Sequence, residues 1–186
     1  MTDLGDIRSV ADLIALANEE HLPKFLCFWR PDPRPDGVLG AECMSQWHRA
    51  GFEIDGTRYA SAEHWMMAEK ARLFGDERIR ARIIDCDHPG EARRLGREVR
   101  GFDENAWQRA RSEIVIVGNV AKFTQNDELT TFLRASSARV LVEASPRDRI
   151  WGIGLEAKDP RSRDPRAWLG QNLLGFALME ARRRIG

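Results

Sequence analysis

Apolar residues recur at three- and four-residue spacing over much of the chain, and this spacing predicts a mainly helical protein. Small polar residues stand where several of these runs begin, as N-caps typically do. A glycine follows one run at the position where helices commonly end. The predicted helices are Ser9–Glu20, Ser61–Phe74 (followed by Gly75), Asp76–Ile84, Pro89 to about Val99, Asp103 to about Phe123, Asp127–Arg134 and roughly Leu169–Arg184.

Short segments with strand character lie between these helices. Phe25–Trp29 is an apolar run bounded by prolines, and Arg139–Glu143 alternates apolar and other residues. Phe52–Ile54 and Arg58–Tyr59 flank Asp55-Gly56, a dipeptide that favours a tight hairpin turn. The expected fold is therefore mainly α with a small antiparallel β-sheet (α+β), in a single domain.

Two polar-aromatic loops, residues 30–40 and 145–166, are longer than simple connectors. Loops of this kind commonly carry functional residues.

Composition places the chain among globular proteins and gives it no overall charge. Apolar residues make up 42% of the chain and charged residues 31%. Lysine plus arginine number 29 and aspartate plus glutamate also number 29, so the formal net charge is 29 − 29 = 0. No general field therefore draws the chain to nucleic acid or to an anionic membrane. No obligate protein partner is evident.

Cysteine usage and the N-terminal residues indicate a cytoplasmic protein. Cys27, Cys43 and Cys86 are odd in number and lack C-x-x-C spacing, which argues against a disulfide framework or a zinc site. The first residues are acidic, and no apolar run is long enough to span a bilayer. No P-loop, complete G-x-G-x-x-G, G-x-S-x-G or H-E-x-x-H motif is present. We expect neither a metal nor a cofactor.

The densest cluster of chemically useful residues is 61–70. With Ser61 as N-cap, Glu63 falls in the first helical turn, where the helix dipole favours an ionised carboxylate. Lys70 lies two turns further on the same face, with a methionine between. A carboxylate and an ammonium about 10 Å apart suit the two ends of a sugar phosphate. The alternative is a helix with a capping acid and solvated charges.

Two further clusters stand later in the chain. A predicted strand leads directly into a loop with Asp148, Trp151 and Gly152, where glycine allows close backbone approach and the indole can stack on a base. The alternative is a β-turn with a core tryptophan. Asn172 opens the last predicted helix, where its amide either binds ribose hydroxyls or caps the backbone.

Together these clusters resemble the NADAR family, to which the YbiA-like proteins belong. The resemblance extends over roughly residues 25–184 and consists of an ordered set of segments. These are residues 56–70 (GTRYASAEHWMMAEK), Ala121-Lys122-Phe123 with Leu129 and Leu133, residues 141–145 (LVEAS) with Asp148, Trp151 and Gly152, and residues 168–175 (WLGQNLLG) with Leu178-Met179.

The resemblance implies an N-glycosidase with the YbiA-like fold. Its substrates would be ribosylamino-pyrimidine phosphates of riboflavin synthesis or ADP-ribosylated guanine in nucleic acid. It implies catalytic roles for Glu63 and Asp148. The implied substrate-binding residues are Lys70 for a phosphate, Trp151 for the base, Asn172 for ribose, and Gly152, Trp65 and Met67 along the pocket. Residues 1–24 would be an N-terminal helical extension, and 25–186 the family domain.

Three features depart from the shorter YbiA-like members. They are the extra N-terminal helix, the proline-rich 30–40 loop, and Trp65-Met66-Met67 where those members carry Tyr-Phe-Gln. The competing interpretation is a non-catalytic module that binds ADP-ribose or NAD and does not require an ionised Glu63.

Overall fold

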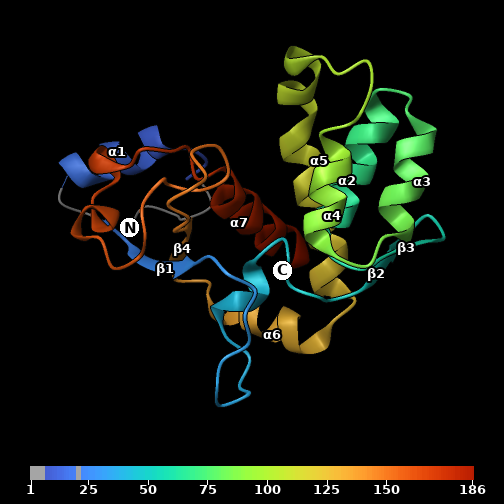
Figure 1. Cartoon of the computed structure of the whole chain (residues 1–186). Helices are drawn as coiled ribbons and strands as arrows, with labels where there is room; N and C mark the ends of the chain where they lie inside the picture. The colour runs from blue at the N-terminus through green and yellow to red at the C-terminus, as the bar shows by residue number, and fades with distance from the viewer. Residues whose placement is uncertain (1–6, 20–21) are drawn as a thin grey trace. The chain divides into compact units, whose positions relative to one another are not determined.

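The computed structural model describes residues 7–19 and 22–186, and the chain folds into two compact units (Figure 1). The first unit comprises the segments up to Ser45 and from Thr131 to Gly186. The second is the continuous segment Gln46–Thr130. The helix α6 (Asp127–Ala135) spans the point along the chain where the second unit ends.

The first unit is built on a pair of parallel strands. Strand β1 (Lys24–Phe28) pairs with β4 (Arg139–Glu143), with Lys24 opposite Arg139 and Phe28 opposite Glu143. The long helix α7 (Leu173–Ile185) packs on β4, and the 3₁₀ helix η2 (Ala41–Met44) lies against β1. Val140, Leu141 and Val142 of β4 are fully buried, so this strand forms the centre of the unit.

The described part of the predicted N-terminal extension belongs to the same unit. Helix α1 (Val10–Asn18) contacts the 3₁₀ helix η4 (Pro165–Ala167), which follows η3 (Pro160–Arg163) in the long C-terminal loop. The predicted boundary at residue 25 stays a prediction.

The second unit is a helical bundle with one hairpin. Helix α2 (Ala62–Leu73) is its central element and contacts α3 (Glu77–Asp85), α4 (Pro89–Gly96) and α5 (Glu104–Thr124), as Figure 1 shows. Because α2 has neighbours on several sides, it is buried along almost its whole length and is not amphipathic.

The hairpin of the second unit confirms the predicted turn. Strands β2 (Phe52–Ile54) and β3 (Thr57–Tyr59) are antiparallel, with Phe52 opposite Tyr59. Asp55 and Gly56 both have positive φ, 50° and 74°, which is the geometry of a type I′ turn.

The mainly helical fold with few strands is confirmed, and the prediction that its strands would be antiparallel holds only for the hairpin. The pair β1–β4 is parallel, and the chain connects these strands through the whole second unit. A parallel pair requires such a long connection. A strand's own sequence pattern does not reveal which distant strand it joins.

Three of the predicted helix starts are confirmed by their side-chain caps. Ser9, Asp76 and Asp103 accept hydrogen bonds from the backbone N–H groups of Asp12, Ile79 and Ala106 at 3.2, 3.2 and 2.6 Å. The last helix was predicted to begin near Leu169 but begins at Leu173. The intervening N–H groups of Leu169, Gln171 and Asn172 donate to Ile153, Arg149 and Gly152 instead of starting a helix. None of the helices among the described residues is both long and apolar enough to cross a membrane.

Candidate functional site

Glu63 occupies the first turn of α2 and is only 4% exposed. Its backbone N–H donates to the carbonyl of Gln46 at 3.0 Å, which joins the segment before β2 to the start of α2. A carboxylate in this position benefits from the positive end of the helix dipole. The predicted location of Glu63 in the first helical turn is confirmed, whereas its catalytic role stays a prediction.

Two buried amide side chains form a second polar feature of the same unit. The carbonyl of Val115 can only accept a hydrogen bond, so the group of Asn119 that lies 2.8 Å from it is the donor Nδ2. The same Nδ2 donates to Oε1 of Gln46 at 3.0 Å. This orientation leaves the acceptor Oδ1 of Asn119 and the donor Nε2 of Gln46 buried and without a hydrogen-bond partner among the described residues.

An unpaired buried donor or acceptor costs on the order of 1–3 kcal/mol. The Gln46–Asn119 amide pair is therefore a polar feature that packing alone does not explain.

Lys122 is the third notable polar residue of the second unit. It lies one helical turn after Asn119 on α5 and is 0% exposed, which is rare for lysine. Its ammonium lies 5.2 Å from the centroid of the Phe123 ring. Lys122 belongs to the segment Ala121-Lys122-Phe123 that carries the family resemblance, and its sequence pattern alone predicted no role for it.

Lys70 lies near the C-terminal end of α2. Its Nζ donates to the carbonyl of Gly96 at 2.8 Å and lies 4.2 Å from the Phe102 ring centroid. Burial is the main cause that lowers the pKa of Lys70. The ammonium is thus held by a carbonyl and an aromatic face, and its predicted contact with a phosphate stays a prediction.

Trp65 and Met67 pack α2 against its neighbours. The indole Nε1 of Trp65 donates to the carbonyl of Ile114 at 2.7 Å, and the ring lies against Gly118 of α5. The side chain of Met67 packs against Gly96 of α4 in the same way. Both side chains are buried. Their predicted contact with a substrate gains no support from this geometry, because their surfaces serve helix packing.

His64 forms a hydrogen-bonded relay at the same helix start. Its Nε2 lies 3.1 Å from the carbonyl of Cys86, which can only accept, so Nε2 carries a proton. Nδ1 then accepts from the hydroxyl of Ser61 at 2.8 Å. Ser61 is the N-cap residue but forms no side-chain cap bond, because its hydroxyl is directed to His64. Burial lowers the pKa of His64.

In the first unit, Asp148 organises the loop that follows β4. Its Oδ1 accepts from the N–H groups of Ile150 and Trp151 at 2.9 and 2.8 Å. The second oxygen, Oδ2, accepts no hydrogen bond from the residues that the structure describes. The carbonyl of Trp151 accepts from the N–H of Leu174 at the start of α7. Asp148 thus combines a turn-stabilising role with one available carboxylate oxygen.

Gly152 and Asn172 join this loop to β4 and α7. A Cβ at Gly152 would lie 2.8 Å from the carbonyl oxygen of Glu143, so the glycine allows the chain to approach itself. Asn172 is 0% exposed, and its amide accepts from Glu143 N–H and donates to the carbonyl of Leu141, both at 2.9 Å.

The carbonyl and the amino group of the Asn172 side chain therefore both bond to the backbone of β4, and this side chain does not cap α7. The structure supports a positioning role for Gly152 and Asn172 and gives no support to the predicted substrate contacts.

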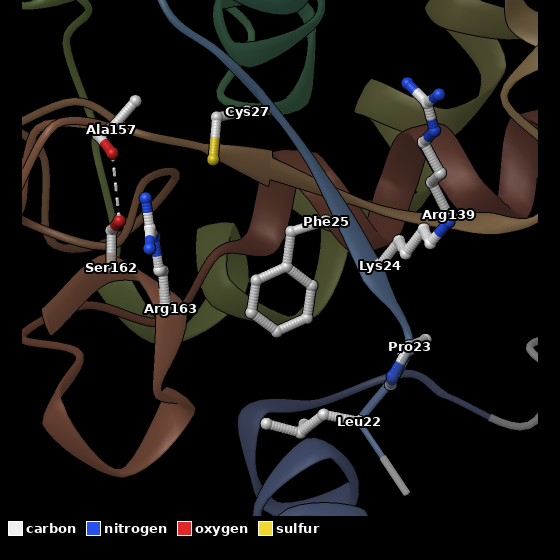
Figure 2. Close-up of a pocket in the computed structure, with 9 residues that line it drawn as sticks. All are labelled: Leu22, Pro23, Lys24, Phe25, Cys27, Arg139, Ala157, Ser162 and Arg163. Carbon is white, nitrogen blue, oxygen red and sulfur yellow. Dashed lines mark hydrogen bonds between the residues drawn. The ribbon is translucent and has the colours of Figure 1, made fainter. Parts of the chain in front are cut away.

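A separate cavity of about 520 Å³ opens in the first unit (Figure 2). It contains none of the predicted site residues. Its lining combines apolar, thiol and cationic side chains, namely Leu22, Pro23, Lys24, Phe25, Cys27, Arg139, Ala157, Ser162 and Arg163.

The NADAR domain family matches residues 27–186, which is most of the chain. The chain belongs to the NADAR family. A relative, N-glycosidase R617 of Acanthamoeba polyphaga mimivirus, is 40% identical over 148 residues, covering 77% of this chain and 87% of the relative.

Two further matches involve YbiA proteins. N-glycosidase YbiA of Shigella flexneri serotype 5b (strain 8401) is 31% identical over 134 residues, covering 72% of this chain and 75% of that protein. The NMR structure of the E. coli protein YbiA superposes with a TM-score of 0.67 at 26% identity, covering 87% of this chain and 84% of that one. The comparisons place the chain among the N-glycosidases, hydrolases that act on N-glycosyl bonds.

Within this NADAR chain, Glu63 was predicted from the sequence, whereas the polar side chains of Gln46, Asn119 and Lys122 were not. A usable signal existed for α5, where an asparagine and a lysine stand one turn apart in a run that is otherwise small and apolar. For Gln46 no local signal existed, because its partner Asn119 is far away in the sequence.

Proposed function

We propose that this chain hydrolyses the C1′–N bond of a phosphorylated ribosyl-base compound. The candidate substrates are a ribosylamino-pyrimidine phosphate of riboflavin synthesis and an ADP-ribosylated guanine. The observation that carries this proposal is the almost complete burial of Glu63 in the first turn of α2, in a chain that belongs with the N-glycosidases.

The proposed chemistry requires a carboxylate near the breaking bond. As the C1′–N bond lengthens, positive charge spreads over C1′ and the ring oxygen of ribose. An ionised Glu63 would stabilise that charge, and its low exposure would make the interaction stronger than in water. Water adds its oxygen to C1′, and the base leaves with the proton that the water loses. We keep Asp148 as the second proposed acid or base, acting through its available Oδ2.

The Gln46–Asn119 amide pair supports recognition of the leaving base. Its unused groups are one acceptor and one donor. A lactam edge, with adjacent N–H and C=O groups, offers the complementary pair. Guanine and the pyrimidinone of the riboflavin intermediates both carry such an edge. A base that satisfied both groups would remove the cost of leaving them unpaired.

The other predicted residues keep narrower proposed roles. Lys70 remains the proposed phosphate ligand, since an ammonium with one bond to Gly96 retains further protons to donate. Trp151 remains the proposed stacking residue. We propose that Trp65, Met67, Gly152 and Asn172 act by positioning neighbouring elements.

The decisive experiment compares Glu63→Gln with the matched variant Glu69→Gln. Both glutamates lie on α2 and both are almost fully buried, but Glu69 pairs with Arg72 at 2.8 Å. Each protein is incubated with a ribosylamino-pyrimidine phosphate, ADP-ribosylated guanosine or NAD, and released base is measured by mass spectrometry. We expect Glu63→Gln to lose at least about a thousandfold in turnover with a nearly unchanged melting temperature, while Glu69→Gln retains turnover.

Two results would contradict the proposal. Equal loss of melting temperature and activity in Glu63→Gln would identify a structural glutamate. Tight binding of these compounds by the wild-type chain without release of base would favour the non-catalytic ADP-ribose or NAD module.

A further inference from the structure

Among the described residues, the lining of the cavity in the first unit carries three cations and no carboxylate. Lys24 and Arg139 stand directly opposite each other at the start of the paired strands β1 and β4. Like charges in such cross-strand positions destabilise a sheet. Neither side chain forms an ion pair with a carboxylate of the described residues. Both side chains are exposed, so water screens their repulsion, and the pair gives this end of the cavity a positive charge.

Arg163 contributes the third charge from the end of η3. Its neighbourhood contains two acids, but Asp159 pairs with Arg161 at 2.7 Å and Asp164 pairs with Arg166 at 2.9 Å. Arg163 has no ion-pair partner in the part of the chain that the structure describes. Figure 2 shows the Phe25 ring with Arg163 on one side and Lys24 and Arg139 on the other.

The wall of the cavity is held in place by hydrogen bonds and ring packing. The hydroxyl of Ser162 donates to the carbonyl of Ala157 at 3.1 Å, as Figure 2 shows, and the carbonyl of Ser162 accepts from the indole of Trp168 at 2.9 Å. The Trp168 ring in turn packs on Phe25 with centroids 5.6 Å apart. A wall fixed in this way can bind a ligand without a large ordering cost.

The thiol of Cys27 does not offset the positive charge. Burial raises the pKa of this thiol, so it stays protonated and neutral near pH 7. The cavity is therefore a cationic site with one aromatic surface.

We propose that this cavity is a second binding site of the chain, and that its ligand is a mononucleotide. Arginine and lysine are the side chains that most readily hold a phosphate, and a base gains about 1–3 kcal/mol by stacking on an aromatic ring. The phosphate would bind Arg163, and Lys24 and Arg139 would add their positive charge from the other side of the Phe25 ring. The base would lie on Phe25. A volume of about 520 Å³ suits a ligand of this size.

This inference is independent of the N-glycosidase reaction. None of the residues proposed for that reaction lines the cavity. A nucleotide bound here would either regulate the enzyme or be kept close to it. Its binding can be tested without any measurement of turnover.

The test is an NMR titration of the full chain with AMP, adenosine and inorganic phosphate. With AMP we expect the backbone amide signals of Phe25, Cys27 and Ser162 to shift and saturate. Adenosine lacks the phosphate and should bind at least about tenfold more weakly, by the value of a charge-assisted hydrogen bond. Binding of AMP should weaken as salt is added.

Paired variants identify the groups responsible. Arg163→Gln should weaken both AMP and phosphate about tenfold, whereas Arg166→Gln, with the same charge change in the same loop, should weaken neither. Phe25→Leu should weaken AMP but leave inorganic phosphate unchanged. Melting temperatures verify that each variant is folded. Equal effects of the two arginine variants, or the absence of saturable shifts at Phe25, Cys27 and Ser162, would overturn the proposal.

Discussion

At the scale of single residues, His64 is a buried base that the fold keeps neutral. One nitrogen donates to the carbonyl of Cys86 and the other accepts from Ser61, so a second proton would have to reverse the bond to the Ser61 hydroxyl. Burial lowers its pKa below the usual value of about 6.5. When the pH falls below that value, His64 therefore binds a proton in the unfolded chain but stays neutral in the folded chain.

This linkage predicts a stability profile. The contribution of His64 is fully present above about pH 6.5 and is lost as the pH falls through the lower pKa of the folded chain, with a slope of at most about 1.4 kcal/mol per pH unit. Urea unfolding of wild type between pH 7.5 and 5 should show this fall. The neutral variant His64→Gln should be less stable at pH 7.5 but show a flatter profile. Parallel profiles would mean that other groups cause the dependence.

The candidate site could be predicted only where residues close together in the sequence carry the signal. Glu63 was found because Ser61 fits an N-cap two residues before it and Lys70 lies two turns further on the same helix face. The Gln46–Asn119 pair was not found, because a glutamine in a loop acquires meaning only when folding brings an asparagine to it. For Asn172 the helix-start position was correctly noticed, but the bonds of its amide to β4 were not readable from the sequence.

At the scale of elements, glycines set how closely α2 approaches its neighbours. Alanine in place of a helical glycine normally stabilises a helix by about 1 kcal/mol. At Gly118 of α5 a new methyl group would overlap the Trp65 ring, which is held by its bond to Ile114. We therefore expect Gly118→Ala to lower the free energy of unfolding by about 1–3 kcal/mol, measured by urea denaturation.

The Trp65→Leu background provides the control for this prediction. With the ring removed, Gly118→Ala should become neutral or stabilising. If the alanine costs the same in both backgrounds, the contact between α2 and α5 does not explain the glycine.

Elements also show which parts of the fold were predictable. The helices and the β2–β3 hairpin were predicted well, because N-cap residues, the spacing of apolar residues and turn residues are all features of the local sequence. The pairing of β1 with β4 was not predicted, because it joins segments separated by the whole second unit. The start of α7 was placed four residues early, because the N–H groups of Leu169, Gln171 and Asn172 donate to the 149–153 loop, a pairing that the local sequence does not reveal.

At the scale of the whole molecule, the division into two compact units was not visible in the sequence, since no linker marks it. The second unit is nevertheless one continuous segment, Gln46–Thr130, with its own buried core. That core includes Phe52, Ile83, Leu95 and Val115 from the hairpin and from α3, α4 and α5. The first unit, by contrast, requires two segments from opposite ends of the chain.

This difference predicts how fragments behave. A fragment of residues 46–130 should be helical by circular dichroism and unfold cooperatively, although its small core will make it less stable than the full chain. Because it lacks Asp148 and Trp151, it should release no base from any substrate that the full chain cleaves. A fragment of residues 131–186 lacks β1, which pairs with β4, and should remain unfolded. Non-cooperative melting of 46–130 would show that its buried residues do not form an independent core, and turnover by it would remove Asp148 from the proposed mechanism.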